Sequence, residues 1–442
     1  MEAYSIVIIL LAVAIGLSPV ASKIKIPYPI LLLIAGIGVG FIPGFQQVSI
    51  NPDVVFLIFL PPMLYDAAFN ISFRDFRNNM NTISLLAISL VFITATGIAV
   101  VARYCIPGMT WPLAFVLGAI LSPPDAIAAA GVTKGLHLPH RTNTILEGES
   151  LVNDASALVA FRFAVATVAG SSFVLWKAGV MFLVAMGGGF LMGWIIWLIF
   201  AFINLKFRLN SSVIVSLNVM LPFVAYLLAE EFHVSGVIAV VTAGLIISRH
   251  KRKFSEEVRI QSKSVWDTVT FILGGLIFIL IGLTFPRVLE DIPFKELGSL
   301  IGASFLIFLI ALIIRIIVIF WHEFDSKKKL KMFQERLATM PEWKKNEKVR
   351  RHYEERLRRI KNFKPLSIKD CIIIGWSGMR GIVSLAAALS LPLVMDDGSV
   401  FPLRDTIIFL TVVVVIIMLI IQGIGLPLLI KLLKMKEYSK LS

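Results

Sequence analysis

Apolar runs of about 20 residues, the length of a membrane-spanning helix, recur along this 442-residue chain between short polar segments. Such a helix crosses the ~30 Å hydrocarbon core of a bilayer, where lipid offers no partners to unpaired backbone N–H and C=O groups. Charged residues make up 16% of the sequence, whereas a soluble domain carries about a quarter. The sequence therefore predicts an all-α polytopic protein that crosses the cell membrane several times.

The apolar runs predict about thirteen transmembrane helices in a single transmembrane domain over residues 1–442. The expected spans are 3–21, 27–43, 52–71, 81–104, 111–133, 144–169, 173–203, 211–230, 234–249, 264–285, 297–322, 367–393 and 405–433.

The lysines and arginines indicate the orientation of these spans. With the N-terminus outside, 34 of the 42 fall in inner loops and the C-terminal tail, 5 in outer loops and 3 within spans. Cytoplasmic loops carry an excess of positive residues, so this distribution predicts N-out, C-in and an odd number of spans.

The largest group of positive charges lies in a predicted basic cytoplasmic loop, 324–366. Residues 324–369 hold 16 lysines and arginines against 6 acidic residues, which is most of the net charge of +14. A basic protein can bind nucleic acid, but here the charge belongs to one loop between two spans. We expect a solvated loop, helical on both sides of Pro341, that contacts anionic lipid headgroups, and no nucleic-acid partner.

Two of the spans are predicted to be discontinuous. The span 111–133 contains Pro123 and Pro124, which remove two amide donors and interrupt a helix. The span 367–393 contains glycines on both sides of Arg380. Broken helices seven spans apart run in opposite directions, which is typical of a transporter built from inverted repeats.

The span 144–169 carries an unusual set of polar side chains for a membrane helix. They are Glu147, Glu149, Asn153, Asp154 and Arg162. Ionisable groups at bilayer depth are costly and by default mark an ion or proton pathway. We therefore expect the functional site on this helix.

Hard cations bind several oxygen ligands. The expected ion-binding residues are Asp154, Asn153, Ser150 and Asp125, with carbonyls freed by the break near Asp125, and the expected ligand is a monovalent cation at Asp154. A carboxylate that takes up either a proton or a cation, but not both, exchanges one for the other.

Arginines within two other spans have separate expected roles. Arg380 is predicted to neutralise Glu149 as a structural ion pair. Arg315 lies near the inner end of its span and is predicted to extend towards the interface.

Four ordered motifs resemble the CPA1 branch of the monovalent cation/proton antiporters, which includes the sodium/proton exchangers. They are LPPMLYDAA at 60–68, LSPPDA at 121–126, GESLVNDA at 148–155 and GMRGIVSLAAALSLP at 378–392. The resemblance implies a thirteen-helix fold with a dimerisation domain and a mobile core domain, a homodimer, and transport by alternating access. It implies that Asp154 binds cation and proton in turn, that Glu149 pairs with Arg380, and that exchange is electroneutral.

One position departs from the family pattern. Many relatives read S-P-T-D-P where this chain has Ser122, Pro123, Pro124, Asp125 and Ala126. The threonine hydroxyl is lost, so that oxygen must come from the backbone or from water.

We expect sodium/proton exchange. Potassium/proton exchange is the main alternative, because nothing in the sequence determines which ion radius the site accepts. A cation channel is a weaker alternative, since no selectivity sequence such as TVGYG occurs. An intramembrane aspartyl protease would need two matched aspartates, and no GxGD-like loop accompanies Asp125 or Asp154. We therefore expect no enzymatic activity and no cofactor. Monovalent cations, protons and membrane lipid are the expected partners.

Overall fold

The computed structural model describes residues 3–24, 28–42, 52–125, 140–170, 175–207, 209–290, 292–339, 366–395 and 398–433. Within these ranges the chain is almost entirely helical, and β-type pairing is limited to one antiparallel bridge between Val394 and Val400. The prediction of an all-α protein is confirmed. The described helices are α1 (Ala3–Ile24), α2 (Tyr28–Gly40), α3 (Pro52–Asn70), α4 (Phe73–Asn78), α5 (Met80–Ser84), η1 (Leu85–Leu90, a π-helical turn), α6 (Val91–Cys105), α7 (Trp111–Leu121), α9 (His140–Val168), α10 (Leu175–Phe207), α11 (Ser211–Glu231), α12 (Gly236–His250), η2 (Lys251–Lys253), α13 (Glu256–Glu290), α14 (Phe294–Thr339), α16 (Ile368–Trp376), α17 (Ile382–Leu389) and α18 (Arg404–Leu432).

Seven of the described helical segments are long and apolar enough to cross a membrane. They are Met80–Cys105, Arg141–Val168, Gly179–Phe207, Ser211–Glu231, Glu256–Glu290, Phe294–Lys328 and Arg404–Leu432. Shorter apolar helices cover Ile8–Ala21, Tyr28–Gly40 and Trp111–Leu121. The chain therefore has at least seven apolar helices of membrane-spanning length, in agreement with the predicted polytopic class.

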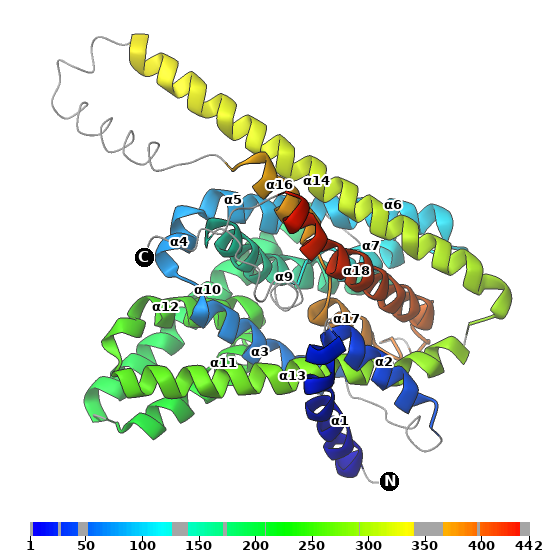
Figure 1. Ribbon diagram of the computed structural model, residues 1–442, viewed down its shortest axis with the longest axis horizontal. Coiled ribbons are helices and arrows are strands. Elements are labelled where there is room, and N and C mark those ends of the chain that lie inside the picture. The colour runs from blue at the N-terminus through cyan, green and yellow to red at the C-terminus, as the bar shows by residue number, and fades with distance from the viewer. Residues whose placement is uncertain are drawn as a thin grey trace.

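The longest helix, α14, lies across the molecule beside α18 (Figure 1) and packs against α6, α16 and α18. Its 46 residues span about 69 Å at 1.5 Å per residue, well over the ~30 Å of hydrocarbon. Its last part, 324–339, continues as helix into the segment predicted as a basic loop. The helix predicted after Pro341 falls in 340–365, outside the described residues.

Small residues bring some of the helices into close contact. Where α2 meets α13, a Cβ atom on Gly36 would overlap the carbonyl oxygen of Ile279, and one on Gly282 would overlap that of Leu33. In membranes, where lipid is as apolar as the side chains, such close backbone packing drives helix association. These two glycines therefore fix how α2 and α13 cross.

Both predicted breaks begin where the sequence places them. Helix α7 ends at Leu121, and residues 122–125 are not helical. Helix α16 ends at Trp376 and α17 begins at Ile382, with a non-helical segment between them. The rest of the first broken span, 126–133, lies outside the described residues.

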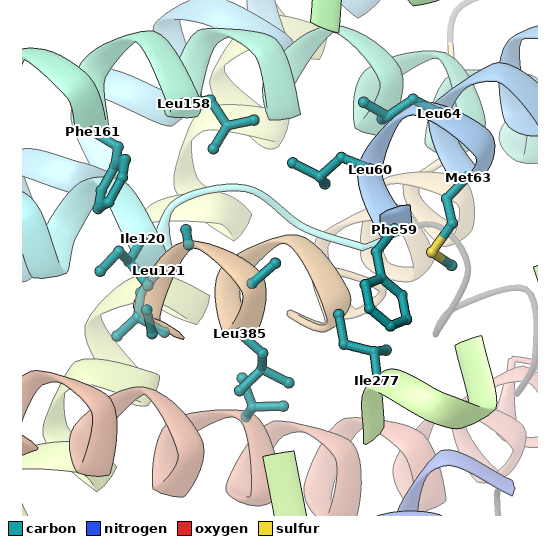
Figure 2. Close-up of a cluster of buried hydrophobic side chains, with 14 of the residues drawn as sticks. Phe59, Leu60, Met63, Leu64, Ile120, Leu121, Leu158, Phe161, Ile277 and Leu385 are labelled. Atoms are coloured by element: carbon teal, nitrogen blue, oxygen red, sulfur yellow. The ribbon is translucent and has the colours of Figure 1, made fainter. Parts of the chain in front are cut away.

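The ends of the broken helices are embedded in an apolar core (Figure 2). The labelled side chains are Phe59, Leu60, Met63 and Leu64 of α3, Ile120 and Leu121 of α7, Leu158 and Phe161 of α9, Ile277 of α13 and Leu385 of α17, all of which are buried. This core joins α7, α9 and α17 into one packed unit, so the polar residues near their ends are held in a defined arrangement.

Candidate ion site

The polar residues of α9 are buried rather than solvated. The exposed fractions are 1% for Glu149, 8% for Ser150, 0% for Asn153 and 4% for Asp154. Glu149 and Asn153, like Ser150 and Asp154, are four residues apart, so the two pairs lie on neighbouring strips of one helix face. These four side chains therefore lie inside the protein, whereas Glu147 is half-buried and accepts a hydrogen bond from Asn143.

Glu149 binds Arg315 of α14 through both of its carboxylate oxygens. The distances are 2.5 Å from Nη1 to Oε1 and 2.8 Å from Nη2 to Oε2. Arg315 is only 4% exposed, so it does not extend to the interface as predicted. The predicted pairing of Glu149 with Arg380 is wrong, because the planar fork of Arg315 already occupies both oxygens.

Arg380 instead holds the end of the first broken helix. Its Nε donates to the carbonyl of Leu121, the last residue of α7, at 2.5 Å, and Nη1 donates to the Gly378 carbonyl at 3.3 Å. Nη1 also lies 3.4 Å from the Met418 sulfur of α18. The last carbonyls of a helix lack intrahelical partners and carry partial negative charge, which a buried guanidinium satisfies.

The same arrangement recurs at the other half-helix ends. Arg315 Nε donates to the Ile374 carbonyl in the last turn of α16 at 3.0 Å. Arg404 Nη2 donates to the carbonyl of Leu389, the last residue of α17, at 3.4 Å. Its Nε donates to the carbonyl of Leu391, two residues further on, at 3.0 Å. Each described half-helix therefore ends on an arginine from elsewhere in the fold.

The end of α7 contacts both the second break and α9. The Asp125 amide donates to the Met379 carbonyl at 2.6 Å, and a Cβ atom on Gly381 would overlap Asp125 Oδ2. On the other side, Ser150 Oγ donates to the Pro124 carbonyl at 3.3 Å. The residues predicted from two distant motifs are thus brought together where the broken helices cross.

Asn153 and Asp154 lie one turn along α9 from this crossing. The Oδ1 and Nδ2 atoms of Asn153, and Oδ1 of Asp154, are buried without a hydrogen-bond partner in the described part of the chain. Asp125 and Glu149 are the acidic residues whose charges act on Asp154. Since Glu149 is paired with Arg315, Asp125 and Asp154 remain as the nearby carboxylates, and their charge attracts a cation or a proton.

Several contributors were not identified from the sequence. Arg315 carried a usable signal, because an arginine inside a span is by default functional. Arg404 carried no signal in the sequence, since its hydrogen bonds to backbone carbonyls depend on where α17 ends. Arg162, whose role the sequence leaves open, forms an ion pair with Glu230 of α11 at 2.8 Å.

Comparison with known proteins shows which family the chain belongs to. A match to the transmembrane sodium/hydrogen exchanger family covers residues 7–432. The chain belongs to this family. It is therefore a multi-pass sodium/proton antiporter of the cell membrane and not an enzyme.

Individual relatives align over nearly the whole chain. An uncharacterized sodium/proton exchanger of Mycobacterium tuberculosis is 33% identical over 438 residues, which are 98% of this chain and 74% of the relative. A sodium, potassium, lithium and rubidium/proton antiporter of Bacillus pumilus is 32% identical over 442 residues, which are 97% of this chain and 61% of the relative. The solved structure of the sodium/proton antiporter MjNhaP1 from Methanocaldococcus jannaschii has a TM-score of 0.70 at 18% identity, covering 97% of this chain and 98% of that chain, and so shows a shared fold.

Proposed function

We propose that sodium and protons are exchanged at one site, where they compete for the carboxylate of Asp154. The observation that carries this proposal is that Oδ1 of Asp154 and the amide group of Asn153 are buried with no hydrogen-bond partner among the described residues. Buried polar groups in proteins are normally hydrogen-bonded, and an exception needs an explanation. A bound cation or a proton on Asp154 provides one.

The remaining ligands come from the crossing of the broken helices. Ser150 bonds the Pro124 carbonyl at 3.3 Å, and Asp125 lies against Gly381, so carboxylate, hydroxyl and carbonyl oxygens lie within one or two turns of Asp154. Such a mixed oxygen set suits a hard monovalent cation. The cation is cargo here, and no resident cofactor enters the proposal.

The Arg315 contact supports a single working carboxylate. A carboxylate whose two oxygens both accept hydrogen bonds from a buried guanidinium is already engaged in a strong bidentate pair. Glu149 is held in that way, so we assign it a structural role and leave Asp154 as the exchanging group. One cation replaced by one proton makes the exchange electroneutral.

We further propose the finer topology that the sequence predicts. It comprises thirteen crossings with N-out and C-in, inverted repeats related through the two broken spans, and a basic inner loop at 324–366. The positive-inside count supports this orientation. Alternating access then opens the crossing to one side at a time, and we expect a homodimer.

Inside-out membrane vesicles with an imposed pH gradient test the proposal. The wild-type chain should dissipate the gradient on addition of Na⁺, and Li⁺ and K⁺ are compared in the same assay. Asp154→Asn should abolish the response to every cation, because an amide takes up no proton. Glu231→Gln, at an exposed carboxylate at the end of α11, serves as the control and should transport normally.

Three outcomes would contradict the proposal. If Asp154→Asn still dissipated the gradient, another group would be the exchanging site. If cation flux persisted without coupled proton movement, the chain would act as a channel. A response to K⁺ alone would replace sodium by potassium as the transported ion.

A further inference from the structure

We propose that Ser384 of α17 supplies an additional oxygen ligand to the transported cation, opposite Asn153 and Asp154. This inference rests on the proposed function, because it places Ser384 at the same site. The α7 side of that site is short of side-chain oxygens. Residues 123–125 are two prolines followed by Asp125, so beyond one carboxylate they offer only backbone carbonyls.

The first step of the argument concerns direction along the membrane. Near their N-terminal ends, α9 and α16 are joined by a hydrogen bond from Thr142 Oγ1 to Asp370 Oδ1 at 3.1 Å. Further on, both segments reach the same non-helical stretch just after α7, since Ser150 bonds the Pro124 carbonyl and Gly381 meets Asp125. The α16–α17 pair therefore runs in the same direction as α9.

The second step concerns depth. From the level of Pro124 and Asp125, Asn153 and Asp154 lie three and four residues beyond Ser150 on α9. Ser384 lies three residues beyond Gly381 on α17. At 1.5 Å per helical residue, both rises are about 4.5–6 Å. Ser384 thus lies at the depth of Asn153 and Asp154.

The third step concerns the face of α17. The direction in which a Cβ atom would leave Gly381 leads into the Asp125 carboxylate, towards the crossing. Residues three apart on a helix share a face. Gly381 is the N-cap of α17, and its carbonyl accepts a hydrogen bond from the Leu385 amide at 3.2 Å. Ser384 therefore lies in the first turn after it, on the side of the crossing, while Asp125 lies against the N-terminal end of α17, where an anion is favoured.

The fourth step is the state of the hydroxyl. Ser384 is 1% exposed, and its Oγ has no hydrogen-bond partner in the part of the chain that is described. Two other buried helical hydroxyls bond the carbonyl four residues back, Ser304 with Leu300 and Thr411 with Ile407, each at 2.8 Å, whereas Ser262 of α13, like Ser384, does not. Ser384 is the third residue of α17, and the residue four before it, Arg380, is in the break. Its hydroxyl is thus left free for a ligand.

Ser384→Ala tests this assignment in the vesicle assay. We expect the KM for sodium to rise about five- to tenfold, the effect of losing one favourable polar contact, with the maximal rate nearly unchanged. The ratio of KM values for Na⁺, Li⁺ and K⁺ should also change, because a missing ligand affects ions of different size unequally. Ser384→Thr keeps the hydroxyl and should retain affinity close to that of the wild type.

The control is Ser390→Ala at the C-cap of the same helix. Ser390 Oγ already bonds the Ala387 carbonyl at 2.7 Å, so its loss should leave all three KM values unchanged. If Ser384→Ala does not fold, Ser384→Cys replaces the hydroxyl by a poor sodium ligand of similar size and must raise the KM for sodium.

The outcomes separate this inference from the proposed function. Unchanged KM values in Ser384→Ala or Ser384→Cys, with transport abolished in Asp154→Asn, would overturn the role of Ser384 and leave Asp154 as the site. A lower maximal rate with unchanged KM ratios would make Ser384 a packing residue and also overturn the inference. Transport by Asp154→Asn would instead contradict the proposed function itself.

Discussion

Arg315 of α14 holds both carboxylate oxygens of Glu149 of α9, and its Nε donates to the Ile374 carbonyl of α16. One buried side chain therefore connects the helix of the ion site, the long helix and the second broken helix. Gly378 makes room for it, because a Cβ atom there would lie 2.5 Å from Arg315 Cδ. The ion pair thus has a positional role: it fixes α9 relative to the break.

Removing Arg315 should be strongly destabilising. Arg315→Ala leaves the Glu149 carboxylate buried without a partner, and breaking a buried pair in this way costs about 3–5 kcal/mol. We expect a large loss of folded protein in detergent, measured by size-exclusion chromatography. Arg315→Ala combined with Glu149→Gln should recover part of the yield, because the unpaired Glu149 carboxylate is then replaced by a neutral amide. A double variant no better than Arg315→Ala would argue against this account, and Arg287→Ala at an exposed arginine is the control.

Arg380→Ala should reduce folded yield more than it changes cation preference. Arg380 contacts the Leu121 and Gly378 carbonyls rather than any residue proposed as a cation ligand. Its loss leaves the end of α7 unsatisfied, at a cost of about 1–3 kcal/mol per buried group. Yield and the KM values for Na⁺, Li⁺ and K⁺ should be measured on the same preparations. Normal yield with altered affinities would place Arg380 in the ion chemistry instead.

Gly381→Ala should impair transport without a matching loss of expression. The added methyl group would overlap Asp125 Oδ2, so the carboxylate must move away from the crossing. We expect the KM for sodium to rise and the maximal rate to fall. Gly298→Ala, at a position where a Cβ atom meets nothing within 4 Å, is the matched control and should behave as wild type. Wild-type kinetics in Gly381→Ala would mean that the position of Asp125 does not matter.

Sodium and protons should compete. If one proton and one cation share Asp154, then below the pH at which the site is half-protonated the KM for sodium should rise about tenfold per pH unit. Above that pH it should level off, and the maximal rate at saturating sodium should depend on pH much less. Initial rates over a matrix of pH and sodium concentration provide the measurement. A sodium KM independent of pH would contradict competition at a single carboxylate.

The Arg162–Glu230 pair should contribute little through its charge. The two side chains are 56% and 27% exposed, and pairs of that kind are worth about 0–1 kcal/mol. Glu230 also accepts a hydrogen bond from the Gly236 amide at the start of α12, at 3.1 Å. We therefore expect Glu230→Ala to lower the melting temperature more than Arg162→Ala does. Equal decreases in melting temperature would indicate that the hydrogen bond from the Gly236 amide to Glu230 does not stabilise the fold.

Much of this protein follows from its sequence. The length of the apolar runs requires membrane helices, because neither water nor lipid can satisfy exposed backbone at that depth. Prolines 123 and 124 and the glycines around Arg380 dictate where two spans break, since both residue types act on the local backbone. The buried polar face of α9 likewise follows from the four-residue spacing of its side chains.

Only the tertiary structure decided which arginine pairs with which buried group. Glu149 and Arg315 are 166 positions apart, and no spacing rule distinguishes Arg315 from Arg380 as the partner of Glu149. The choice depends on how α14 packs against α9 and α16, and on which half-helix end needs each guanidinium. Packing likewise buries oxygens of Asn153, Asp154 and Ser384 that have no hydrogen-bond partner in the described parts of the chain, because burial removes water without supplying another donor or acceptor there.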